Sequence, residues 1–202
     1  ASSLTFTGAT IGSTSVSSAL QFSISSSFAM TTTTVRSSAG GVALAVRPST
    51  TGATVNIASN TITHTCTSNQ CIGLAVYPTV VGSVFPGTIT IASHTISETA
   101  SGSASTGVGI RVSSSDGATT TPIQINAAAS ITANKINVTS TGATTTGVAL
   151  DVVIGCSSTT PTVTLSSNLI GVIVSGSGRA DGVWVYGSSC SYFYGTSLNV
   201  YV

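Results

Sequence analysis

A short segment recurs along the chain at nearly constant spacing, and this repetition restricts the fold more than any other feature. Residues 55–62 read VNIASNTI, residues 89–96 read ITIASHTI and residues 163–170 read VTLSSNLI. A looser copy combines residues 123–125 with residues 131–136. The Asn or His of each copy stands at position 60, 94, 134 or 168, so the steps are 34, 40 and 34 residues. Such self-similarity predicts a solenoid, in which each repeat buries its apolar side against its neighbours.

A second unit accompanies each copy and predicts a further strand. In residues 41–46 it reads GVALAV, where Val42, Leu44 and Val46 alternate with small residues, as in a strand with one buried face. Its other copies are residues 72–76, 107–112, 147–152 and 182–186. With strands at residues 55–57 and 60–62, each repeat then contains three short strands, and the variable Ser/Thr/Gly/Pro segments absorb the changes in period.

The two ends of the sequence set the expected number of coils. We predict a single β-solenoid domain over residues 1–202 with about five coils, in which residues 22–24 form an earlier first strand and residues 4–11 a degenerate coil. Neither end contains a charged cap or an amphipathic helix, and open strand edges invite pairing with another chain. We therefore expect head-to-tail stacking of copies of this chain. The predicted assembly edges contain Leu4, Phe6, Leu198, Val200 and Val202.

The composition excludes several classes of protein. Ser and Thr account for 71 of 202 residues, while charged residues make up 4% and include a single lysine. A nucleic-acid binder needs more cations to neutralise phosphates, and 41% apolar residues is too many for a disordered chain. The apolar runs are too short for a transmembrane helix. Ala1 is expected to be a mature terminus left by signal-peptide cleavage, which predicts an extracellular or cell-surface protein.

The four cysteines suit an oxidising compartment and are predicted to form two disulfides. Cys66 and Cys71 flank a four-residue loop and can close it locally. Cys156 and Cys190 occupy nearly equivalent places one coil apart, and adjacent coils are about 4.8 Å apart. No Cys-x-x-Cys or paired-His spacing occurs, so neither a metal nor a cofactor is expected.

Catalytic chemistry is not expected from the ionisable residues. The chain contains four carboxylates, at positions 98, 116, 151 and 181. The repeat register aligns Asp151 with Arg111 and Tyr186, which predicts an exposed cross-strand ion pair, while Asp181 is placed in a turn. His64 and His94 have no spaced Ser or Asp partner. Because a glycosidase needs two acids that face each other, we predict that the chain is not an enzyme.

Three strands per coil and a recurrent Asn at a bend resemble the right-handed parallel β-helix of pectate-lyase-like proteins. That resemblance implies an all-β fold with a ladder of stacked side chains inside the bend, to which Asn60, Asn134 and Asn168 would belong and from which His94 departs. The weakly charged Ser/Thr/Gly/Val repeats are also similar to those of large kinetoplastid surface proteins of the dispersed gene family. This second resemblance implies a cell-surface role.

Three functions are consistent with these patterns. The leading hypothesis is a structural protein that stacks head to tail into a filament or surface stalk. It would carry glycans at the single sequon, Asn137, and on the Ser/Thr-rich tracts at residues 49–51, 113–121, 139–146 and 157–162. The alternative is a carbohydrate-binding or carbohydrate-cleaving β-helix, and its sugar contacts would be Arg47, Tyr77, Arg111, Trp184 and Tyr186. Alternating Thr at positions 61, 63, 65 and 67 leave ice binding as a third hypothesis.

Overall fold

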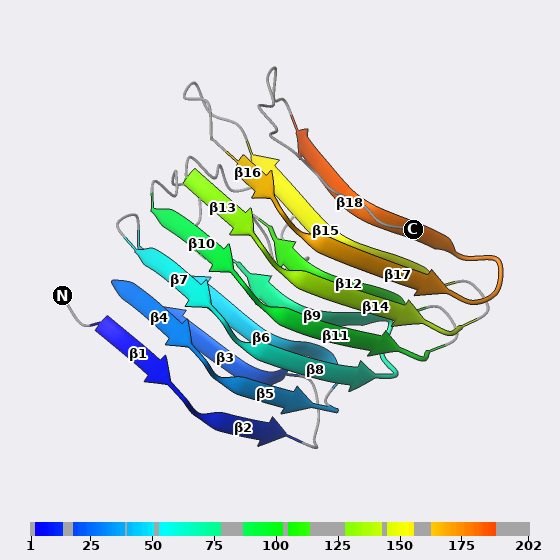
Figure 1. The fold of residues 1–202 in the computed structure, drawn as a ribbon, viewed down its shortest axis with the longest axis horizontal. Helices are drawn as coiled ribbons and strands as arrows, with labels where there is room; N and C mark the ends of the chain where they lie inside the picture. Colours follow the sequence, from blue (N-terminus) through cyan, green and yellow to red (C-terminus); the bar gives the residue numbers. More distant parts are fainter. Residues whose placement is uncertain are drawn as a thin grey trace.

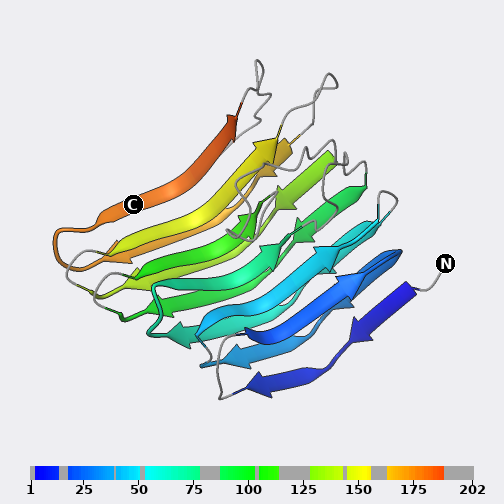
Figure 2. The same ribbon diagram turned by 180° about the vertical axis from the view of Figure 1, so that it is seen from behind.

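The chain coils into three parallel β-sheets of six strands each. The computed structural model describes residues 3–13, 18–38, 40–50, 53–77, 87–102, 105–113, 128–142, 145–155 and 163–188. Figure 1 and Figure 2 show that the chain runs through the first and second sheets on one side and returns through the third on the other. It climbs one coil with each circuit, in a right-handed sense. The predicted parallel β-helix is confirmed. Within these residues no helix is long and apolar enough to cross a membrane.

Each coil contributes one strand to every sheet, and neighbours in a sheet come from consecutive coils. The first sheet consists of β1 (Ser3–Thr7), β4 (Ser27–Thr31), β7 (Thr54–Ala58), β10 (Thr88–Ala92), β13 (Ala128–Thr132) and β16 (Val163–Ser166). The second consists of β2 (Thr10–Ser13), β5 (Thr34–Ser37), β8 (Thr61–Cys66), β11 (Thr95–Ala100), β14 (Lys135–Ser140) and β17 (Leu169–Val174). The third consists of β3 (Ser18–Ile24), β6 (Gly41–Pro48), β9 (Gln70–Val76), β12 (Thr106–Val112), β15 (Thr146–Gly155) and β18 (Arg179–Ser188).

The solenoid has six coils where the sequence predicted about five. The difference arises at the N-terminal end, where residues 22–24 belong to the third strand of the first coil: Phe22 pairs with Val46. The first strand of the second coil is β4, whose Met30 pairs with Ile57. That step is 57 − 30 = 27 residues, and extrapolating the later period of 34 therefore placed the strand wrongly. In the looser copy the first strand is β13, while residues 123–125 lie outside the described residues.

The core is a column of aligned aliphatic side chains inside the three sheets. Residues of one parity along each strand point inward, and parallel in-register pairing places each above its equivalent in the previous coil. Ile57, Ile91 and Ile131 form one such row and are fully buried. Full burial of an aliphatic side chain stabilises the folded state by about 1.5–3 kcal/mol. In the first two coils, rings fill the same space: the ring centroids of Phe22 and Phe28 are 5.0 Å apart.

Between the first and second strand, every coil turns through one residue with left-handed backbone. Its φ is 66° at Gly8 and between 50° and 58° at Thr32, Ser59, Ser93, Ala133 and Ser167. This conformation costs a non-glycine residue about 1–2 kcal/mol. Because it recurs in all six coils, the bend has one fixed shape, and the residue that follows it always points into the interior.

The residues that follow the bend form a continuous hydrogen-bonded ladder. The backbone N–H of Thr33 donates to Asn60 Oδ1 at 2.8 Å, and the N–H of His94 donates to Asn134 Oδ1 at 2.9 Å. The N–H of Asn134 donates in turn to Asn168 Oδ1 at 3.1 Å. Each Asn Nδ2 also donates to a first-strand carbonyl of the preceding coil, at 2.9–3.2 Å. The ladder therefore supplies acceptors to bend amides that are shut away from water, where an unmet donor would cost about 1–3 kcal/mol.

His94 takes the place of one Asn and reproduces both of its bonds. Its Nδ1 accepts from the backbone N–H of Asn60 at 3.1 Å, so Nε2 carries the proton and donates to the Ile57 carbonyl at 2.9 Å. Only the neutral Nε2–H tautomer fits, because a proton on Nδ1 would face another donor. Burial lowers the pKa of His94 to about 4, against the partly opposing effect of the bonds to Ile57 and Asn60.

The left-handed bend generates a stability prediction. Ala133 is exposed and has a φ of 56°, so Ala133→Gly removes the backbone strain without losing a packed side chain. Glycine also raises the entropy of the unfolded chain, and the net gain should be about 0.5–1 kcal/mol of unfolding free energy. Ala92→Gly, in the regular strand β10, is the matched control and should lose about 0.5–1 kcal/mol. Denaturant unfolding measures both; equal losses in the two variants would contradict the strain argument.

His94 generates a pH prediction. Its pKa is about 4 in the folded chain and 6.5 ordinarily, so the unfolded chain binds more protons between these values. Its contribution to stability is therefore complete above pH 6.5 and declines as the pH falls towards 4, by on the order of 3 kcal/mol. His94→Asn keeps the ladder and should remove this part of the pH dependence, as measured by urea unfolding from pH 7 to pH 4. Identical profiles for the parent and the variant would refute this assignment.

Candidate functional site

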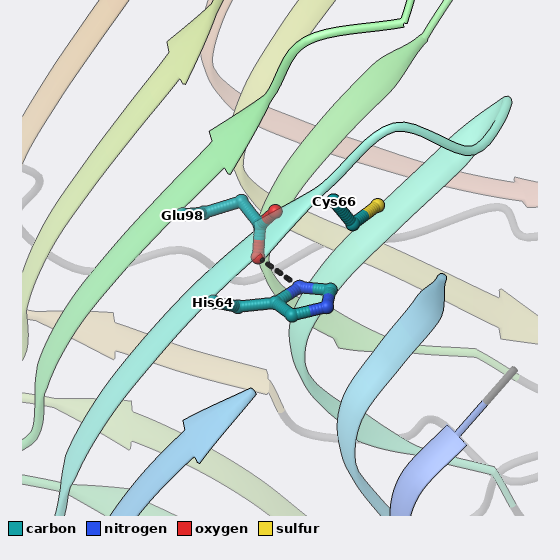
Figure 3. A group of neighbouring side chains, drawn as sticks. All are labelled: His64, Cys66 and Glu98. Atoms are coloured by element: carbon teal, nitrogen blue, oxygen red, sulfur yellow. Dashed lines mark hydrogen bonds and ion pairs between the residues drawn. The ribbon is translucent and has the colours of Figure 1, made fainter. Parts of the chain in front are cut away.

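One group of polar side chains lies inside the solenoid, among aliphatic residues. Alternation along β8 turns His64 and Cys66 inward, and β11 turns Glu98 inward directly opposite His64. His64 Nδ1 lies 2.8 Å from Glu98 Oε2, and the three side chains have one potential ligand atom each within 4.8 Å of one another. Figure 3 shows them converging on a common point. His64, Cys66 and Glu98, all at most 2% exposed, are referred to below as the inner cluster.

The electrostatics of the inner cluster are dominated by burial. Burial raises the pKa of Glu98, and the hydrogen bond and charge of His64 act in the opposite direction. The second carboxylate oxygen, Oε1, is buried without a hydrogen-bond partner. The carboxylate therefore has one oxygen engaged with the imidazole and one available to a further ligand.

The sequence contained a signal for this pairing. His64 and Glu98 are 34 residues apart, which is the step between the ladder positions 60 and 94. Residues one period apart are neighbours in a solenoid. Sequence analysis searched for partners of His64 at short sequence separation, and this is why it missed Glu98.

A second polar group lies on the outer side of the third sheet. Arg111 Nε donates to Asp151 Oδ2 at 2.7 Å across β12 and β15. The pair was predicted to be exposed, and this is wrong: the side chains are 16% and 4% exposed. Tyr77 is buried beside them; burial raises the pKa of its hydroxyl, while Arg111 opposes the shift. Ile72, Val108 and Val148 form a small apolar cluster with Tyr77 on the same side, and partial desolvation strengthens the ion pair.

The other residues predicted to contact sugars are distributed along this sheet. Trp184, and not Tyr186, stands opposite Asp151, because Val153 pairs with Tyr186. Trp184 is 39% exposed and lies against Arg179, whose guanidinium carbon is 5.3 Å from the ring centroid. The charge of Arg47 acts on the Tyr77 hydroxyl.

The carboxylates do not form an acid pair in the part of the chain that the structure describes. Glu98 lies inside the coil, whereas Asp151 and Asp181 lie on the third sheet and contact Arg111 and Arg179 respectively. Asp181 belongs to β18 and not to the predicted turn. Asp116 lies outside the described residues. Each described carboxylate is therefore held by a cationic group or an imidazole.

Two of the four cysteines fall within the described residues. Cys66 and Cys71 form a disulfide, with Cα atoms 5.9 Å apart, that closes the turn between β8 and β9. Both are buried together with Ala100. Cys156 and Cys190 lie outside the described residues.

The predicted glycosylation and assembly residues are only partly described. Asn137 is exposed on the outer side of the second sheet, in β14. Leu4 and Phe6 lie in β1, where Leu4 is 40% exposed and the ring of Phe6 packs 5.0 Å from that of Phe22. Leu198, Val200 and Val202 lie outside the described residues, as do most residues of the Ser/Thr-rich tracts.

The alternating Thr residues also lie on the outer side of the second sheet. Thr61, Thr63 and Thr65 are exposed on β8, and β11 presents Thr95, Ser97 and Thr99 in register with them. The next coil presents Lys135, Asn137 and Thr139. The regular array of hydroxyls thus spans two coils, and ice binding stays a prediction.

Neither the protein-family models, nor the curated proteins, nor the solved structures contain a match to this chain.

Proposed function

We propose that this chain is a structural β-solenoid that stacks coil on coil into a filament or surface stalk. The observation that supports the proposal most directly is the state of the last described coil. Val163 and Leu165 of β16 are only partly buried, whereas the equivalent Ile89 and Ile91 of β10 are fully buried. A further coil in the same register would bury them and continue the aliphatic column.

Sheet edges and exposed apolar groups at the same end favour this assembly. Among the described strands, β16, β17 and β18 each pair with one neighbour, as do β1, β2 and β3 at the opposite end. Leu169 and Ile173 of β17 are 45% and 66% exposed. Strand addition would satisfy both the unpaired backbone groups and the apolar surface. The contact is heterologous, so it generates an open filament.

The surface chemistry fits an extracellular location. A neutral, Ser/Thr-rich exterior carries few charges to keep it soluble, and attached glycans would supply that solubility. Asn137 is exposed and therefore accessible to a glycosyltransferase. The similarity in composition to dispersed-gene-family surface proteins of kinetoplastids belongs to the same proposal.

A second candidate function, carbohydrate binding, is supported by the outer side of the third sheet. Arg111, Asp151, Tyr77 and the exposed Trp184 combine a cation, hydrogen-bonding groups and an aromatic face on one surface. These are the groups that bind acidic sugars by charge, hydrogen bonds and stacking. No acid pair accompanies them among the described residues, so the candidate is binding without hydrolysis.

We expect a cation in the last core row to block filament formation. Leu165→Lys should prevent stacking, because burying an unpaired ammonium at the junction costs several kcal/mol. Thr164→Lys adds the same charge at the next position of the strand, turned to the other face, and should still assemble. Electron microscopy and sedimentation velocity measure the outcome, with a rise per subunit of about 29 Å for six coils of about 4.8 Å. A parent protein that stays monomeric at high concentration would exclude the filament.

A binding experiment tests the second candidate. If the third sheet recognises an acidic polysaccharide, Arg111→Ala should weaken binding by at least about tenfold, the loss of one charged hydrogen bond. Arg36→Ala, an exposed arginine on the second sheet, is the matched control and should bind like the parent. Affinity electrophoresis against polygalacturonate provides the measurement. Absence of retardation for the parent protein, or equal losses in both variants, would argue against a carbohydrate site here.

A further inference from the structure

The inner cluster is not required to build a coil. At the position of His64 and Glu98, the next two coils carry Val138 and Val172. At the position of Cys66, the next coil carries Ala100. Replacing a buried ionic pair by aliphatic residues is often neutral or stabilising, because two polar groups no longer have to leave water. The repeat itself thus shows that small apolar residues suffice here, and folding alone does not account for an imidazole, a carboxyl and a sulfur at one place.

The geometry of the inner cluster matches the needs of a metal ion. A tetrahedral Zn²⁺ takes imidazole nitrogen, carboxylate oxygen and thiolate sulfur at about 2.0–2.3 Å, which places ligand atoms about 3.5 Å apart. The three ligand atoms here already lie within 4.8 Å of one another. Glu98 Oε1 is buried without a partner. On the facing sheet Gly73 leaves space beside the carboxylate, since a Cβ there would lie 3.5 Å from Glu98 Oε2.

The disulfide controls whether the sulfur can act as a ligand. Bonded to Cys71, the Cys66 sulfur carries no thiolate charge, and only His64 and Glu98 remain as strong ligands. A dithiol reductant transfers two electrons and two protons to the S–S bond, so that two thiols form and the dithiol becomes a disulfide. A divalent cation then displaces the proton of the Cys66 thiol and the proton shared by His64 and Glu98. Thiolate, imidazole and carboxylate are left as its ligands.

We propose that reduction of the Cys66–Cys71 disulfide converts the inner cluster into a binding site for a zinc-like divalent cation, with His64, Cys66 and Glu98 as ligands. The oxidised chain keeps the site closed, and the reduced chain opens it. Metal binding then stabilises the same turn between β8 and β9 that the disulfide closes, by linking two adjacent coils through β8 and β11.

The experiment uses Co²⁺ as a spectroscopic probe. The chain is prepared with the disulfide intact, and a second sample is reduced with a dithiol, which is then removed without air. We expect the reduced chain to bind one equivalent of Co²⁺ at the inner cluster, with d–d absorption of a tetrahedral site and a thiolate-to-cobalt charge-transfer band. Its affinity should exceed that of the oxidised chain by at least about 100-fold, as the thiolate ligand is gained. Equal affinities in the two samples would overturn the proposal.

Matched variants assign the ligands. The double variant His64→Val with Glu98→Val copies the next coils and should fold but lose this binding. Cys66→Ala copies Ala100, is the smaller change, and should lose the charge-transfer band together with at least about tenfold of the affinity. His94→Asn changes the other buried histidine and should bind as the parent does. A reduced double variant that binds Co²⁺ like the parent, or a charge-transfer band that survives Cys66→Ala, would show that other residues hold the ion and would refute the site.

Discussion

The solenoid depends on how the chain turns a corner inside a dry core. Between the first and second strand of each coil the backbone passes through a left-handed residue, and the amide that follows points along the axis and away from water. A side chain from the next coil accepts its hydrogen bond, as Asn60 does for Thr33. The same side chain returns a donor to a carbonyl of the preceding coil. Because each coil satisfies the one before it, the bends are locked in register, and this alignment in turn stacks the aliphatic rows.

The chain uses its few charges in contacts between coils or within one strand. Arg111 and Asp151 join adjacent coils on the outer side of the third sheet, His64 and Glu98 join adjacent coils inside, and Arg179 holds Asp181 within β18. The exterior that remains is composed mostly of Ser and Thr hydroxyls. Such a surface supports the proposal of an assembled, glycosylated structural protein better than that of an enzyme, which would have to bring acids together. The inner cluster adds a redox-dependent element to the same framework, since the proposed metal ion and the disulfide would stabilise the same turn.

Residues near the centre of the repeat were predictable because their period is regular. The strands around Ile57, Ile91 and Leu165 follow from alternation, and the ladder positions follow from the recurrent Asn. The N-terminal coils were misassigned, because their period is shorter and Phe22 fits the pattern of either a first or a third strand. Trp184 was placed two residues out of register with Asp151, because nothing local distinguishes Trp184 from Tyr186. The inner cluster escaped because its members are close only through the stacking of coils.

The sequence by itself determined the class of fold, the three strands per coil and the positions that face inward, because these follow from alternation within a strand and from repetition between coils. It also determined the position of the bend through the recurrent Asn. Only the tertiary structure decided which side chains meet across coils, how many coils there are, and that the pair formed by Arg111 and Asp151 is buried. Burial and contact depend on what lies on the neighbouring coil, which a repeat of variable length does not encode locally. The imidazole at position 94 shows both sides: its place was visible in the sequence, whereas its tautomer and lowered pKa came from the bonds to Asn60 and Ile57 and from the surrounding core.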